Sequence, residues 1–215
     1  MVVQQLQGLL SGIYDLPLPY DVCDFLFTDR ERLPAGARDS GTDEQVLVRE
    51  DGEGAAVGVY LDAQLLRRLA EANPLLALNA GNIADYWTAL EGVSHFLYLA
   101  WHGGHDRPVS LLELELQAEI DKYVTSWWLL SEQQPQRLPR ELHPLLFERT
   151  RVDSALAGDR VELYREANRY AARFCRRLER QLSGAARVRQ EVLAELRRFY
   201  RLSRERKMRH IQRHA

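Results

Sequence analysis

Cysteine is scarce in this sequence, since its 215 residues include only Cys23 and Cys175. Two cysteines exclude a disulfide-rich scaffold and a zinc site built from several thiolates. Cys175 falls on the apolar side of an amphipathic helical pattern, where a thiol acts mostly as an inert packing group. We therefore expect a reducing, cytoplasmic environment and no catalysis by cysteine.

Long apolar runs and known catalytic motifs are also absent. No run approaches the roughly 18 apolar residues that a membrane-spanning helix needs, and residues 1–10 lack the basic start of a secretory signal. The sequence contains no glycine-rich phosphate loop, dinucleotide fingerprint, H-E-x-x-H motif or G-x-S-x-G motif. We therefore assign no catalytic residue from motifs.

Lysine is nearly missing, because all but Lys122 and Lys207 of the 29 basic residues are arginine. Such a bias is typical of a GC-rich genome, and we expect a bacterial source. The net charge of −2 hides an asymmetry: residues 173–215 hold 14 basic and 4 acidic side chains. Either this basic end packs on the acidic remainder of the chain, or it binds an acidic partner.

Residues 1–75 have the pattern of a small α/β portion. Alternating apolar residues on both sides of the Asp51–Gly54 turn predict a β-hairpin over 44–61. Residues 22–27 favour a further short strand, and Asp62 is placed to cap a helix that ends before Pro74.

Helical patterns dominate from residue 76 onward. Four amphipathic segments run from Asp85 to about 102, from Ser110 to about 130, from Asp159 to about 182 and from about 185 to 200. Ser110 and Glu113 have the spacing of a capping box. The fold class is therefore mainly α: a bundle of at least four helices over 76–202, a small α/β portion over 1–75, and a basic tail over 203–215 that is frayed or ordered only by a partner.

A candidate metal site comes from two neighbouring helical patterns. Glu91 and His95 are four residues apart and share one helical face. The short loop at 103–108 makes the next helix antiparallel, which brings up Glu115 and Glu119. Carboxylate and imidazole groups are ligands of divalent metals, so this set suggests a metal-dependent hydrolase. The alternative is that Glu115 is solvated, Glu119 pairs with Lys122 and His95 is a core histidine.

Aromatic residues concentrate between residues 86 and 128, which include all four tryptophans. Two helices cannot turn all of them inward, so either other helices cover them or an aromatic surface remains for a partner. We expect Trp87 and Trp128 on such a surface.

Three functions remain open. The first is a non-enzymatic regulatory or adaptor protein that binds another protein through the aromatic face and the basic C-terminal helix. The second is the metal-dependent hydrolase, and no cofactor other than a divalent metal is expected. The third is nucleic-acid binding, which the sequence pI of about 6.3 and the lack of a recognition signature disfavour. The basic residues expected to contact a partner are Arg197, Arg198, Arg201, Arg204, Arg206, Lys207, Arg209 and Arg213.

Overall fold

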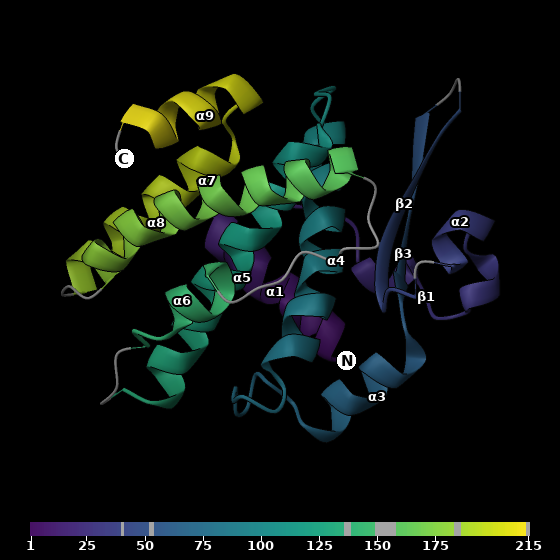
Figure 1. The fold of residues 1–215 in the computed structure, drawn as a ribbon, viewed down its shortest axis with the longest axis horizontal. Helices are drawn as coiled ribbons and strands as arrows, with labels where there is room; N and C mark the ends of the chain where they lie inside the picture. The colour runs from purple at the N-terminus through teal and green to yellow at the C-terminus, as the bar shows by residue number, and fades with distance from the viewer. Residues whose placement is uncertain (40, 52–53, 136–138, 149–157, 183–185, 214–215) are drawn as a thin grey trace. The chain divides into compact units, whose positions relative to one another are not determined.

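Helices make up most of the chain, as the sequence predicts (Figure 1). The computed structural model describes residues 1–39, 41–51, 54–135, 139–148, 158–182 and 186–213. Within these ranges the helices are α1 (Val2–Tyr14), α2 (Ala35–Arg38), α3 (Ala63–Glu71), α4 (Ile83–Gly103), α5 (Leu111–Gln133), α6 (Leu142–Phe147), α7 (Gly158–Leu182), α8 (Ala186–Tyr200) and α9 (Arg204–Arg213).

The predicted hairpin is confirmed. Strands β2 (Glu44–Asp51) and β3 (Gly54–Leu61) pair antiparallel, and β1 (Leu26–Phe27) adds a short parallel strand on the other side of β3. The segment expected to be a strand at 22–27 begins as a 3₁₀ turn over Val22–Asp24, because the Asp21 side chain accepts a hydrogen bond from the Cys23 amide. The result is a mainly α fold with a small mixed sheet near the N-terminus.

Two helix starts follow the capping rules. The Asp62 side chain accepts a hydrogen bond from the Gln64 amide at the start of α3. At the start of α5, Ser110 accepts from the Glu113 amide while the Glu113 carboxylate accepts from the Ser110 amide. Each pair satisfies amides that have no partner within the helix, so both boundaries are local properties of the sequence.

Contacts group the chain into two compact units. The N-unit comprises Met1–Ser11 and Leu16–Pro108, and the C-unit comprises Gly12–Asp15 and Val109–Ala215, so α1 contributes to both. The division expected from the sequence (1–75, 76–202 and 203–215) stays a prediction, because compactness does not test whether a segment folds independently. No helix among the described residues is long and apolar enough to cross a membrane.

In the N-unit, α4 packs against β2 and β3, and α3 packs against α4 (Figure 1). Its apolar core includes Val59, Leu65, Leu90 and Val93, all fully buried. Because α4 lies directly on the sheet, polar side chains on this helix can meet side chains from the hairpin.

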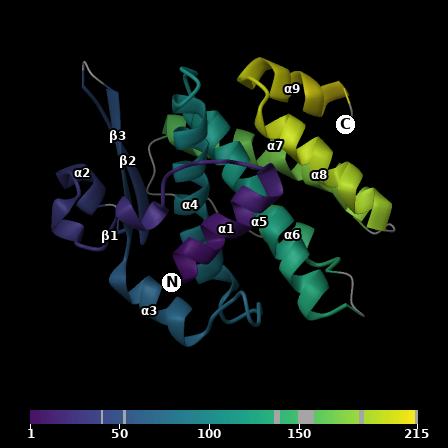
Figure 2. The ribbon, with the colours of Figure 1, turned by 180° about the vertical axis from the view of Figure 1, so that it is seen from behind.

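In the C-unit, α7 is the central helix and contacts α5, α6, α8 and α9 (Figure 2). Phe174 and Phe199 stack with ring centroids 4.2 Å apart, which joins α7 to α8. The tail expected to be frayed is instead largely the helix α9, and Lys207 and Ile211 on it are buried. That expectation was wrong because it counted only apolar residues and treated the lysine as solvated.

Candidate metal centre

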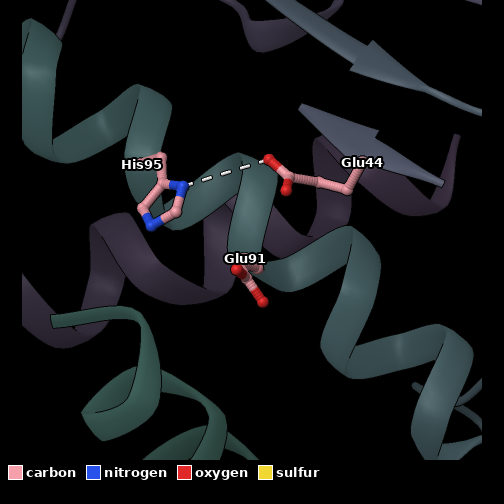
Figure 3. Close-up of side chains that lie close together, drawn as sticks. All are labelled: Glu44, Glu91 and His95. Atoms are coloured by element: carbon pink, nitrogen blue, oxygen red, sulfur yellow. Dashed lines mark ion pairs between the residues drawn. The ribbon is translucent and has the colours of Figure 1, made fainter. Parts of the chain in front are cut away.

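The polar cluster in the N-unit consists of Glu44, Glu91 and His95 (Figure 3). Glu91 and His95 lie one turn apart on α4, as the spacing predicts. Glu44 is the first residue of β2 and points its carboxylate toward His95. Each residue offers one donor atom, and the three donor atoms lie within 4.8 Å of one another.

Gly92 gives Glu44 its place against the helix. A Cβ atom built on Gly92 would lie 3.1 Å from both Cγ and Oε1 of Glu44, and 3.3 Å from a Val59 methyl group. A glycine inside a helix costs roughly 0.5–1 kcal/mol relative to alanine. The space that Gly92 leaves is filled by Val59 on β3 and by the Glu44 side chain. The absence of a side chain at Gly92 therefore lets Glu44 lie against the face of α4 that holds Glu91 and His95.

An ion-pair network holds the elements that carry the cluster. Arg68 on α3 makes two hydrogen bonds of 2.8 Å to the Asp85 carboxylate on α4. The same guanidinium lies 3.4 Å from Asp43, the residue before Glu44. A bidentate arginine pair has a defined geometry. Arg68 therefore links α3, the first turns of α4 and the start of β2.

The geometry is close to what a divalent ion requires. His95 Nδ1 and Glu44 Oε1 are 3.9 Å apart, and their side chains are only 8% and 13% exposed. Ligands about 2.1 Å from a tetrahedral metal lie about 3.4 Å from one another. Small side-chain rotations therefore bring the donor atoms to that spacing.

The structure brings together two of the four residues predicted for this site, and metal binding by them stays a prediction. Glu91 and His95 lie together, and Glu44 is a member that sequence reasoning missed. No short-range spacing identifies Glu44, because it precedes Glu91 by most of the hairpin, α3 and the following loop. Glu115 and Glu119 lie on α5 in the C-unit, and their participation stays a prediction. Among the described residues, this is the one group of three or more potential ligands with converging donor atoms.

Carboxylates on α5 are more buried than expected. Glu115 is 5% exposed, although it was expected in solvent under the alternative interpretation, and Asp121 is 1% exposed. Glu119 does accept a 2.7 Å hydrogen bond from Lys122, but that pair is mostly buried. The long helix α5 has buried residues all around its circumference, so a single apolar stripe does not describe its packing.

A second polar cluster fills the C-unit. Lys207 is fully buried, and its Nζ donates a 2.8 Å hydrogen bond to the Gln117 side chain. The Gln117 amide donates to the Tyr14 hydroxyl at 3.0 Å and to Asp121 Oδ1 at 2.9 Å. Tyr14 in turn donates to Asp121. Burial, and after it the charge of Asp121, raises the pKa of Tyr14 well above its usual value. This network joins α1, α5 and α9.

Several residues expected to contact a partner are engaged inside the chain. Lys207 is buried and is withdrawn from the partner surface. Arg197 donates to the carbonyls of residues 12 and 13, and Arg201 donates to those of residues 14 and 15. Arg198 pairs with Glu195. Arg197 and Arg201 therefore donate to carbonyls at the C-terminal end of α1, where helix carbonyls lack partners.

The remaining expected contact residues keep surface access. Arg204, Arg206, Arg209 and Arg213 on α9 are exposed. Trp87 and Trp128 are half-buried, and the Trp128 indole donates to Glu132 at 2.8 Å. Trp127 is 5% exposed, so that part of the aromatic group belongs to the core.

Comparison of the chain with family models, with curated proteins and with solved structures finds no match.

Proposed function

We propose that the N-unit binds one divalent transition-metal ion through Glu44, Glu91 and His95. The observation that carries this proposal is the convergence of their donor atoms within 4.8 Å on a mostly buried face of α4. One imidazole nitrogen and two carboxylate oxygens form a donor set suited to zinc, manganese or iron.

The reaction class that best fits such a centre is hydrolysis. Three protein ligands leave coordination positions for water and substrate, as in catalytic zinc sites. A bound ion would lower the pKa of a coordinated water and polarise a carbonyl or phosphoryl oxygen. Glu44, Glu91 and His95 would hold the ion, and the Arg68 network would position Glu44 relative to α4.

Metal binding is tested by elemental analysis of untagged protein and by calorimetric titration with zinc and with manganese. We expect one ion per chain, and we expect His95→Gln and Glu44→Gln each to weaken binding by more than about tenfold. Gly92→Ala should also weaken metal binding, because the added methyl group occupies the space of the Glu44 carboxylate. His105→Gln, an exposed histidine in the same unit, is the control.

Affinity for the metal that is unchanged in His95→Gln and Glu44→Gln would exclude this centre.

Hydrolysis is tested separately, with a nitrophenyl phosphodiester and a nitrophenyl ester as substrates for the metal-loaded protein. Turnover that requires the metal and is lost in His95→Gln supports the reaction class. Stoichiometric metal without turnover of either substrate would leave metal binding standing and remove the hydrolase proposal for those bonds.

A second candidate function is binding of an acidic protein partner through α9. The observation that favours it is the two-sided character of this helix. Lys207 and Ile211 are buried, whereas its four arginines are exposed. Such a surface attracts anions in a salt-dependent manner.

Partner binding is tested with immobilised polyglutamate and with a single-stranded oligonucleotide, at low and high salt. Joint replacement of Arg204, Arg206, Arg209 and Arg213 by glutamine is expected to abolish retention on polyglutamate, whereas Arg67→Gln on α3 leaves it unchanged. Retention of the fourfold variant on polyglutamate would exclude this candidate. Stronger retention of the wild-type chain on the oligonucleotide than on polyglutamate would favour a nucleic-acid partner instead.

A further inference from the structure

A cavity of about 650 Å³ lies beside the small sheet of the N-unit, and the metal proposal does not use it. Its walls include Phe25, Phe27, Leu47 and Val57, and its charged lining residues are Arg32, Arg49 and Asp24. This volume is within the range of small-molecule sites, which combine apolar walls with a few polar groups.

The apolar wall is held in place by the strand register. Phe27 pairs with Tyr60 across β1 and β3, and the two rings lie 5.7 Å apart. A Cβ atom on Gly58 would lie 3.3 Å from the Phe27 ring, so glycine lets this ring lie close against β3. A phenyl ring fixed in this way is a rigid part of the apolar wall and does not have to reorganise when a ligand binds beside it.

The backbone of β3 offers a donor at the same place. The Val59 amide donates to the Phe25 carbonyl, so it points toward β1. Amides two residues apart in a strand point to the same edge, and therefore the Val57 amide faces that edge too. Strand β1 pairs only with residues 59 and 60, so within the described residues it stops short of Val57.

The cavity also carries a surplus of positive charge. Arg32 lies over the Phe27 ring, with its guanidinium carbon 4.9 Å from the ring centroid. Neither Arg32 nor Arg49 forms an ion pair with a carboxylate among the described residues, and Asp24 is the only carboxylate in the lining. Guanidinium groups beside a flat apolar wall are complementary to a carboxylate or sulfonate on an aromatic body.

We propose that this cavity binds a small organic anion with a flat apolar body, held by Arg32 and Arg49 beside the apolar walls of the cavity. The inference is independent of the metal centre, since none of Glu44, Glu91 and His95 lines the cavity.

The test compares two fluorescent probes of nearly equal shape, the anionic anilinonaphthalene sulfonate and the neutral phenylnaphthylamine, by titration of the full chain. We expect one anionic probe per chain and tighter binding of the anionic than of the neutral probe. Arg49→Gln and Arg32→Gln should each weaken the anionic probe by about threefold to tenfold and leave the neutral probe unchanged. Ala56→Leu, which adds volume at the cavity lining, should weaken both.

Arg67→Gln on α3 is the matched control, and circular dichroism confirms that each variant is folded. Absence of binding by the wild-type chain would overturn the proposal, as would equal affinity for both probes with no effect of either arginine. An effect of Arg67→Gln as large as that of Arg49→Gln would show general surface attraction and would also overturn it.

Discussion

Lys207 shows how far a single residue departs from its usual environment in this protein. Its ammonium group donates to Gln117 and lies 4.8 Å and 5.8 Å from the ring centroids of Phe199 and Tyr200. A buried ammonium is tolerated only when hydrogen bonds and aromatic faces replace water. The residue therefore contributes to the core of the C-unit and not to its charged surface.

Replacement of Lys207 is expected to destabilise the chain. Lys207→Ala removes a buried side chain and leaves the Gln117 oxygen without its donor, at a cost of about 3 kcal/mol in the free energy of unfolding. Lys207→Met keeps most of the packing and should cost less. Urea unfolding measures both, with the exposed Arg206→Ala as the control. Equal stability of Lys207→Ala and the control would contradict the buried role.

The two thiols are expected to be unreactive in the folded chain. Burial, with a contribution from Asp21, raises the pKa of Cys23 to about 11, and burial raises the pKa of Cys175 well above its usual value. At pH 7 a thiol of pKa 11 is ionised in about one molecule in ten thousand. Iodoacetamide followed by mass spectrometry should label neither residue rapidly, and Cys175 only after unfolding. Fast labelling of Cys175 in native buffer would contradict this environment.

At the scale of elements, α9 is fastened by few but deeply buried groups. Lys207 and Ile211 are its buried positions, and His210 contacts Glu195 on α8 and Arg177 on α7. The helix is only ten residues long, so packing and not intrinsic propensity accounts for its formation.

Truncation after residue 202 is therefore expected to lower stability. The shortened chain loses the Lys207 and Ile211 contacts and exposes the aromatic faces of Phe199 and Tyr200. A loss of about 3–4 kcal/mol corresponds to a fall of about 10 °C in melting temperature for a chain of this size. A chain that ends at Arg213 is the control. A melting temperature that equals the control would show that α9 adds nothing to the fold.

At the scale of the whole molecule, several shifted pKa values share one direction. Burial lowers the pKa of His210, against the opposing effect of Glu195. Burial alone would raise the pKa of Glu195, but the nearby His210 and Arg198 outweigh burial and lower it. Burial alone would also raise the pKa of Asp62, but the hydrogen bond from the Gln64 amide outweighs burial and lowers it. The cap formed with the Cys23 amide also lowers the pKa of Asp21.

The chain is therefore expected to lose stability in acid in two stages. A group whose pKa is lower in the folded state binds protons more tightly when unfolded, so its contribution is complete above the unfolded pKa and is lost as the pH falls. His210 begins to lose its contribution below about pH 6.5, and the carboxylates below about pH 4.

Urea unfolding between pH 8 and pH 3.5 checks this order. His210→Gln should remove the upper stage and also reduce the lower one, because His210 is one of the groups that lower the pKa of Glu195, while Asp62 and Asp21 keep their contributions. His105→Gln should leave both stages unchanged. Stability that increases on acidification from pH 7 to pH 5 would contradict the assigned directions.

What the sequence determined by itself is local. The hairpin over 44–61, the caps at Asp62 and Ser110, the helical character after residue 76 and the shared face of Glu91 and His95 all follow from turn chemistry, side-chain capping and periodicity. Each of these features depends on residues only a few positions apart, so the local amino-acid sequence is sufficient to predict it.

What only the tertiary structure decided depends on contacts between distant segments. Glu44 meets His95 because β2 packs on α4 at Gly92, and Lys207 is buried because Gln117 on α5 lies beside α9. Burial of a charged side chain depends on the partner that replaces its water, and that partner is far away in the chain. Periodicity therefore predicts that Glu91 and His95 share one face of a helix. Only the tertiary packing shows that Glu44 lies beside them and that Lys207 is buried.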